Sequence, residues 1–288
     1  MAKICIDPGH YGKYNRCPAI PQYYESEMVW KLSYLQKKYL EQMGHIVVMT
    51  RTDPNKDLNL VTRGQKSLGC DLFISNHSNA VGGGMNENVS YAAIYHLVND
   101  TTTKCDDISK EFASKIAPVI GKTMGISYKI LTRQAQSDRN ADGFKNDNYY
   151  GVLHGARLVN TPGLILEHGF HTNTACVKWL LDDNNLDKLA KAEAECINEF
   201  FSGAKQEAKQ EAKQEEKQET NQGLPYKVKI NTTELNVRKG AGTNYPIVTT
   251  VHKNEVYTIV SETMNGKTKW GRLKSGAGYI SLSYTVRV

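Results

Sequence analysis

The chain of 288 residues lacks a hydrophobic run long enough to cross a bilayer, and its amino terminus lacks the pattern of a signal peptide. The short apolar run after Lys3 is broken at once by Asp7 and Pro8. We therefore expect no membrane insertion, and we expect the chain to be made in the cytoplasm without a signal peptide.

The sequence also lacks a Cys-x-x-Cys pair, which argues against a disulfide framework. Its six cysteines lie far apart: Cys5, Cys17, Cys70, Cys105, Cys176 and Cys196. This spacing predicts free thiols in a reducing compartment, most of them small core residues.

Acidic side chains are scarce in the last part of the chain. Residues 224–288 hold ten basic and three acidic side chains, whereas residues 1–203 hold 22 of each. The net charge of +6 therefore belongs to the tail. A basic tail suggests a polyanionic partner, such as a nucleic acid or an anionic cell-wall polymer, unless its charge serves only solubility. Because the tail has no obvious recognition helix, we expect no nucleic-acid binding.

Residues 1–203 alternate short apolar runs with helical periodicity, which predicts an α/β fold around one mainly parallel sheet. Ser26 is the expected N-cap of the first helix, and Gly121 is the expected end of a later one. The predicted strands are residues 3–6, 46–50, 71–76, 92–97 and 163–167, and the predicted helices are residues 26–43, 60–68, 108–119, 174–181 and 186–201.

The rest of the chain has a different pattern. Residues 204–219 repeat Ala-Lys-Gln-Glu, a tract of strong helix formers, and we expect residues 204–223 to form a charged, helix-prone linker. From Tyr226 onward, short strands alternate with turns, which predicts a small all-β barrel over residues 224–288.

Three of the predicted strands end in side chains that carry chemistry. The first stops at Pro8-Gly9 and presents His10, the third ends in His77, and the last ends in Glu167. Open α/β sheets place their active sites at the carboxyl ends of the strands. With Glu25, the two histidines provide a common zinc-ligand set, and Glu167 is placed to act as a general base and acid.

Each of these residues also has a plainer interpretation. A single histidine at a strand end is more often a surface or hydrogen-bonded residue, and the spacing fits no short metal motif. Glu27 competes with Glu25, because a carboxylate in the first turn of a helix is favoured without a metal.

The polar stretch 132–150 either lines a groove or is solvated. The substrate-binding candidates are Asn79, Arg139 and Asn140.

Five runs of the sequence resemble signature runs of the zinc-dependent N-acetylmuramoyl-L-alanine amidase family, the type 3 amidases. They are Ile6-Asp7-Pro8-Gly9-His10 and residues 25–32, 50–51, 74–80 and 166–173, in the order and spacing of the family over about residues 1–203. The resemblance implies a twisted sheet flanked by helices, one zinc ion on His10, Glu25 and His77, and a catalytic Glu167. It also implies cleavage of the amide that joins the lactyl group of N-acetylmuramic acid to L-alanine in peptidoglycan.

Three residues depart from the pattern of that family. Tyr11 stands where a second Gly is usual, Asn76 stands where an aliphatic residue usually precedes the histidine, and His168 replaces a small polar residue. We expect the last two to affect rate and substrate preference more than the type of reaction.

Residues 226–288 resemble a bacterial Src-homology-3 (SH3b) domain in the runs Leu-Asn-Val-Arg, Trp-Gly-Arg-Leu and Gly-Tyr-Ile. The resemblance implies binding to cell-wall peptidoglycan or to its attached polymers, and a spacing module without a ligand is the alternative. An amidase joined to such a domain is similar to a bacteriophage endolysin of a Gram-positive host, which acts on the wall after release.

The sequence is also compatible with other functions. The same zinc chemistry would serve a peptidase that cuts within the peptide stem, and the same architecture would serve a host autolysin or an inactive wall-binding protein. A cysteine nucleophile near His10 has less support, because Cys5 lies within an apolar strand.

Overall fold

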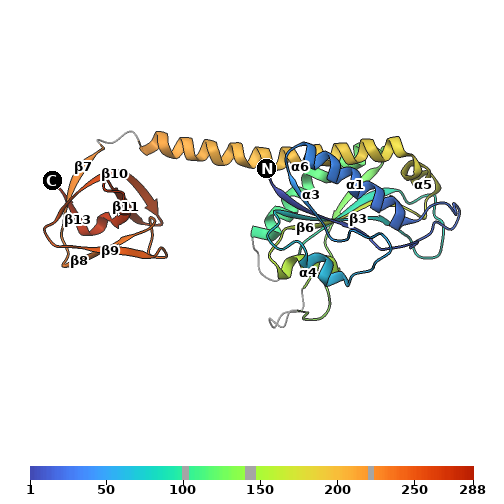
Figure 1. Cartoon of the computed structure of the whole chain (residues 1–288), viewed down its shortest axis with the longest axis horizontal. Helices are drawn as coiled ribbons and strands as arrows, with labels where there is room; N and C mark the ends of the chain where they lie inside the picture. Colours follow the sequence, from blue (N-terminus) through green and yellow to red (C-terminus); the bar gives the residue numbers. More distant parts are fainter. Residues whose placement is uncertain (99–103, 140–146, 220–223) are drawn as a thin grey trace. The chain divides into compact units, whose positions relative to one another are not determined.

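The computed structural model describes residues 1–98, 104–139, 147–219 and 224–288, with the side chains of these segments except Lys104 and residues 203–219. The chain forms two compact units, Met1–Ala204 and Lys205–Val288, and each is described by itself (Figure 1). Among the described helices, none has both the length and the apolar character needed to span a membrane.

The first unit is built on a six-stranded sheet with the order β2-β1-β3-β6-β4-β5. Its strands are β1 (Lys3–Pro8), β2 (Ile46–Met49), β3 (Leu72–Asn79), β4 (Tyr91–His96), β5 (Ser127–Leu131) and β6 (Gly163–Phe170). The pairs β1–β2, β1–β3, β3–β6 and β4–β5 are parallel, and β4 runs antiparallel to β6. The prediction of a mainly parallel sheet with flanking helices is therefore confirmed.

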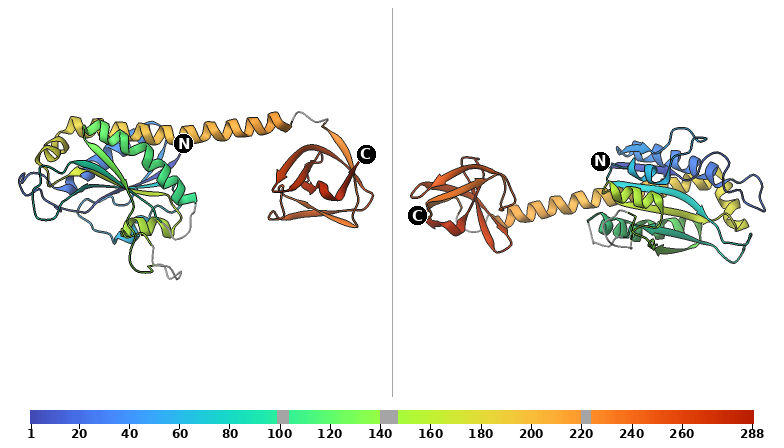
Figure 2. Two further views of the ribbon diagram at one scale, coloured as in Figure 1. Left: turned by 180° about the vertical axis from the view of Figure 1, so that it is seen from behind. Right: turned by 90° about the horizontal axis from the view of Figure 1, so that it is seen from below.

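Helices cover both faces of this sheet. Successive side chains of a strand point to opposite faces, so each strand contributes side chains to the cores on both sides. Ile4 and Ile6 of β1 belong to the core shared with α1, α3 and α6, whereas Cys5 belongs to the core shared with α4. Figures 1 and 2 show α3 and α6 on one side of the sheet and α4 on the other. The helices are α1 (Glu25–Gln42), α2 (Leu60–Gln65), α3 (Lys104–Met124), α4 (Gly151–Leu158), α5 (Thr174–Leu181) and α6 (Asp183–Glu219).

Two predicted helix boundaries are wrong. Helix α1 begins at Glu25 with Tyr24 at its N-cap, so Ser26 is not the cap. The Ser26 hydroxyl instead donates to the carbonyl of Gly12 at 2.7 Å. Helix α3 continues through Gly121 to Met124, and the chain turns at Gly125, whose φ of 69° is in the left-handed region that favours glycine.

The second unit contains a seven-stranded sheet with the order β13-β7-β10-β11-β12-β8-β9, and its described pairs are antiparallel. Val228, Val237, Ile259 and Ile280 lie in its apolar core. The all-β prediction is confirmed for this unit. Its elements are β7 (Tyr226–Ile230), β8 (Glu234–Arg238), β9 (Ile247–His252), β10 (Val256–Asn265), β11 (Thr268–Leu273), β12 (Tyr279–Ser281), the 3-10 turn η1 (Leu282–Tyr284) and β13 (Thr285–Arg287).

Candidate metal centre and catalytic site

The sheet order places the three chemistry-bearing strand ends next to one another. Strands β1, β3 and β6 are parallel neighbours, so their carboxyl ends meet at one edge. The β3–β6 register pairs His77 directly with Glu167. The backbone N–H of Gly9, just before His10, donates to the carbonyl of Asn76 at 3.0 Å.

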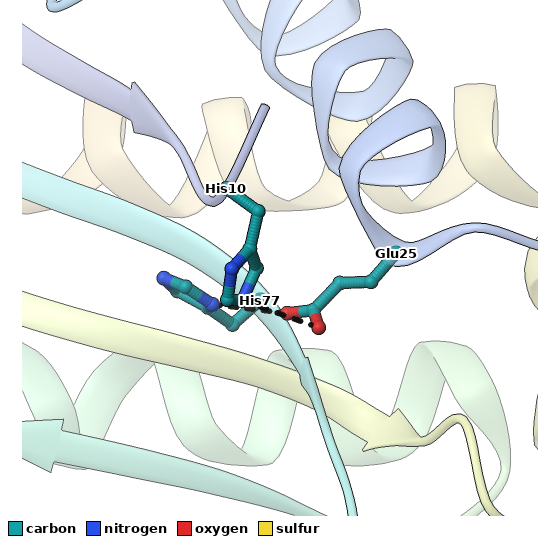
Figure 3. Close-up of side chains that lie close together, drawn as sticks. All are labelled: His10, Glu25 and His77. Atoms are coloured by element: carbon teal, nitrogen blue, oxygen red, sulfur yellow. Dashed lines mark hydrogen bonds and ion pairs between the residues drawn. The ribbon is translucent and has the colours of Figure 1, made fainter. Parts of the chain in front are cut away.

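His10, Glu25 and His77 converge at this edge (Figure 3). The Nε2 atom of His10 lies 3.3 Å from Oε2 of Glu25, and Nδ1 of His77 lies 2.9 Å from Oε1. All three ligand atoms lie within 4.8 Å of one another. Glu25 is buried at the start of α1, whereas Glu27 is exposed. The geometry therefore favours Glu25 over Glu27 as the third member of the cluster.

The turn that carries His10 is held tightly. His10 has a φ of 55°, which is uncommon for a residue with a side chain. Its carbonyl accepts a hydrogen bond from the buried guanidinium of Arg63 at 3.1 Å. Gly9 allows the close approach of the next strand, because a Cβ there would lie 2.5 Å from Cε1 of His77.

Asn15 and His171 also lie beside Glu25, and neither was predicted from the sequence as a site residue. Asn15 donates through Nδ2 to Oε2 of Glu25 at 2.6 Å and lies 3.1 Å from Nε2 of His10. His171 lies 3.8 Å from the same carboxylate oxygen and donates to the carbonyl of Ser78 at 2.9 Å. His171 stands in one of the signature runs, which was a usable signal, but Asn15 lies in an aperiodic loop.

The pKa values of Glu25 and Glu167, the two carboxyl groups of the site, are shifted in opposite directions. Burial alone would raise the pKa of Glu25, but hydrogen bonds and charge from His10 and His77 outweigh it and hold that pKa well below its ordinary value. Burial, and then the charge of Glu25, raises the pKa of Glu167 well above its ordinary value. Such a divergence between neighbouring carboxyl groups is typical of acid–base sites.

The donor set fits a zinc ion. Two imidazole nitrogens and one carboxylate are a common set for catalytic zinc, and ligand atoms arranged tetrahedrally about 2.1 Å from a metal are about 3.4 Å apart. Each imidazole nitrogen lies near this distance from one oxygen of Glu25, His10 at 3.3 Å from Oε2 and His77 at 2.9 Å from Oε1, and the three ligand atoms lie within 4.8 Å of one another. Beside the cluster, Oε2 of Glu167 is buried and has no hydrogen-bond partner among the described residues. The hydrogen-bonding capacity of that oxygen is therefore unused among these residues.

A buried polar network supports the β3 backbone behind the cluster. His168 donates through Nδ1 to the carbonyl of His77 at 3.0 Å, and its Nε2 lies 2.8 Å from Oε1 of Glu193. Both side chains are fully buried. Gln36 joins the network by donating to Oε2 of Glu193 at 2.6 Å and accepting from Nδ2 of Asn76 at 2.7 Å. Asn76 and His168, two of the departures from the family pattern, are thus linked through Gln36 and Glu193.

The three substrate-binding candidates have different surroundings. Asn79 follows His77 by two positions on β3, across an irregularity in the β3–β6 register, and its side chain accepts from the N–H of Ala80 at 2.8 Å. Arg139 donates to the carbonyls of Asn148 and Tyr149 at 2.8 Å and 2.7 Å, so its described contacts lie in its own loop. Asn140 lies outside the described residues.

Comparison with protein families identifies two regions of the chain. Residues 4–199 match the family described as N-acetylmuramoyl-L-alanine amidase, and residues 233–286 match the bacterial SH3 domain family. A curated relative, N-acetylmuramoyl-L-alanine amidase CwlM of Bacillus licheniformis, is 27% identical over 210 residues, which cover 72% of each protein.

Solved structures share the fold of the first unit. Cwp6 from Clostridium difficile is similar with a TM-score of 0.57 and 25% identity over 69% of this chain, which corresponds to 29% of the Cwp6 chain. The catalytic domain of CwlV, an N-acetylmuramoyl-L-alanine amidase from Bacillus (Paenibacillus) polymyxa var. colistinus, is similar with a TM-score of 0.53. That match has 21% identity over 70% of this chain and 99% of the CwlV domain.

Proposed function

The chain belongs to the N-acetylmuramoyl-L-alanine amidase family, and we propose that it is a peptidoglycan hydrolase that cuts the amide between N-acetylmuramic acid and L-alanine. In this proposal His10, Glu25 and His77 hold one zinc ion, and Glu167 is the catalytic acid and base. The observation that carries the proposal is the convergence of two imidazoles and two carboxyl groups of opposite pKa tendency at one sheet edge.

The proposed chemistry divides between the metal and Glu167. Zinc, when bound, supplies a Lewis acid for the substrate carbonyl and lowers the pKa of its water to about 7. Glu167 takes a proton from the attacking water and gives it to the amine nitrogen of L-alanine as the carbon–nitrogen bond breaks. Its raised pKa suits the acid step, and a neighbouring divalent charge favours the ionised form that the base step needs.

We assign residues 1–203 to catalysis, residues 204–223 to a linker and residues 224–288 to wall binding. The excess of ten basic over three acidic side chains in residues 224–288 supports an anionic wall polymer as the partner of this part. The second unit also has a cavity of about 470 Å³ whose lining includes Glu234, Arg238 and Trp270. A role as a bacteriophage endolysin, with release from the cytoplasm before lysis, completes the proposal.

Mass analysis of a peptidoglycan digest tests the proposed cleavage. We expect released stem peptides that begin with a free L-alanine amine, and removal of the metal with a chelator to abolish their release. Stems cut at an internal bond would contradict the amidase assignment and support a zinc peptidase instead. Intact walls after treatment with the zinc-loaded protein would support an inactive wall-binding protein.

The role of Glu167 is tested by Glu167→Gln, which keeps the shape of the side chain and removes its acid–base function. We expect a loss of about 10² to 10⁴ in kcat, the usual contribution of general acid–base catalysis, at unchanged zinc content. Activity equal to that of the wild type would refute the role.

A further inference from the structure

A stack of aromatic rings leads from the proposed metal centre to the protein surface. The ring of Tyr14 is stacked on the imidazole of His10, with centroids 5.0 Å apart and an interplanar angle of 9°. The ring of Tyr11 is stacked on Tyr14 at 5.8 Å and 28°. Tyr11 is 38% exposed and Tyr14 is 48% exposed. Two partly exposed aromatic rings therefore lie next to a proposed zinc ligand.

The loop that carries these rings is anchored to the first turn of α1. The N–H of Tyr14 donates to the hydroxyl of Ser26 at 2.9 Å, and this hydroxyl donates to the carbonyl of Gly12 at 2.7 Å. The N–H of Gly12 donates in turn to the carbonyl of Pro54 at 2.7 Å. These bonds fix the loop before any ligand arrives, so a ligand that stacks on the rings pays little ordering entropy.

We propose that Tyr11 and Tyr14 form a binding surface for the pyranose ring of the muramic acid residue, next to the bond that is cut. The inference rests on the proposed function. In the proposed substrate only the lactyl group separates the sugar from the scissile amide, so the sugar must lie beside the metal centre. A pyranose presents a face of C–H groups, which packs well on an aromatic ring.

The chemistry of the two rings favours the sugar over the peptide stem. Tyr11 and Tyr14 offer apolar faces and phenolic hydroxyls, whereas the stem presents amides and charged groups that call for ionic or backbone partners. The cations nearest in sequence are engaged elsewhere, because Lys13 and Arg16 both lie over the ring of Tyr24, at 5.4 Å and 6.0 Å from its centroid. The surface formed by Tyr11 and Tyr14 is therefore a site for an uncharged sugar ring.

Tyr11 is the residue to vary, because Tyr14 also contacts His10 and its removal would disturb the proposed metal ligand. The full chain and Tyr11→Gly are compared on two soluble substrates: an N-acetylmuramoyl peptide, and the same peptide carrying an O-methyl-lactyl group without the sugar. We expect the ratio of kcat/KM for the muramoyl substrate to that for the sugar-free substrate to fall about two- to tenfold, as a lost stacking contact predicts.

The fall in this ratio should come from KM, and Tyr11→Phe, which keeps the ring, should restore the ratio. Tyr128→Ala is the matched control, because Tyr128 is 46% exposed but lies on the edge strand β5. An unchanged ratio in Tyr11→Gly, or an equal change in Tyr128→Ala, would overturn the inference.

Binding of the methyl ester of N-acetylmuramic acid, which has no free carboxylate, is followed by tyrosine fluorescence and decides the inference separately from the proposed function. We expect the sugar to quench the fluorescence of the full chain at lower concentration than that of Tyr11→Gly. If the chain binds the sugar in this way but cleaves neither substrate, the proposed function fails and the sugar site stands. Equal binding by both proteins rejects the sugar site, whatever the activity.

Discussion

Gly9 brings the backbone of one strand end against the imidazole of the next. A Cβ at this position would lie 2.5 Å from Cε1 and 2.7 Å from Nδ1 of His77, and 2.6 Å from the carbonyl oxygen of Asn76. Real Cβ atoms do not approach so closely, and the carbonyl belongs to a central strand that cannot easily move. The separation of His10 and His77 therefore depends on a glycine at residue 9.

We predict that Gly9→Ala lowers the affinity for zinc at least about tenfold, because the methyl group must displace the ring of His77 or separate β1 from β3. Competition with a chromophoric chelator measures this affinity. Gly82→Ala is the matched control, since a Cβ there meets nothing within 4 Å. Equal zinc affinity in both variants and the wild type would show that His77 is not held in this way.

The buried polar network of Gln36, Asn76, His168 and Glu193 connects four elements: α1, β3, β6 and α6. Glu193 and His168 are fully buried as a pair, and each has a second partner, in Gln36 and in the carbonyl of His77. Breaking a buried pair by removing one partner costs about 3–5 kcal/mol, whereas replacing both partners with apolar residues is often nearly neutral. Mutation can therefore separate the contribution of this pair to the stability of the fold from its contribution to positioning His77.

We predict that Glu193→Leu lowers the free energy of unfolding by about 3–5 kcal/mol and that the double variant His168→Leu/Glu193→Leu recovers part of this loss. The double variant should still bind zinc more weakly than the wild type, because the carbonyl of His77 has lost its donor. Urea unfolding and chelator competition measure the two quantities. Wild-type zinc affinity in the double variant would mean that the network contributes to stability alone.

Two elements of the first unit escaped sequence prediction for physical reasons. Strand β5 lies at the edge of the sheet, is mostly exposed and has only five residues, so its short alternation of polar and apolar side chains gives a weak signal. Helix α4 contains Gly151 and Gly155, which are poor helix formers. Gly155 is needed because a Cβ there would lie 2.1 Å from the carbonyl oxygen of Val61 in α2. A helix that packs this closely on its neighbour loses the sequence signal of a helix.

At the scale of the whole chain, the local patterns identified the central strands and the strand ends that carry His10, His77 and Glu167. The apolar runs predicted a mainly parallel sheet with its site at the carboxyl ends of the strands, whereas the neighbouring order of β1, β3 and β6 came from the structure. The pairing of Gln36 with Glu193, and of Asn15 with Glu25, joins residues through tertiary packing alone. Such contacts leave no periodic signal in one sequence.

All six cysteines are free and buried, as the spacing predicted for most of them. Burial, and then nearby carboxylates, raises the pKa of both Cys105 and Cys196 to about 12. An unfolded thiol has a pKa of about 8.5, so the unfolded state loses these protons first as the pH rises. The stabilising contribution of the two protonated thiols is therefore full below about pH 8.5 and is lost as the pH rises toward about 12.

We predict a decline in the free energy of unfolding above about pH 8.5 that is shallower in the double variant Cys105→Ala/Cys196→Ala. Urea unfolding at a series of pH values measures both slopes. The variant is needed as a reference because lysine and tyrosine side chains also titrate in this range. Identical slopes in the two proteins would show that the buried thiols do not couple to stability.

X-ray absorption at the zinc edge of the full chain loaded with one equivalent of zinc tests whether His10, Glu25 and His77 hold the metal. We expect nitrogen and oxygen ligands at about 2.0–2.2 Å from the zinc, with the outer-shell scattering of two imidazole rings and with one ring lost in His77→Gln. A zinc–sulfur distance of about 2.3 Å, or a spectrum unchanged by His77→Gln, would contradict this assignment.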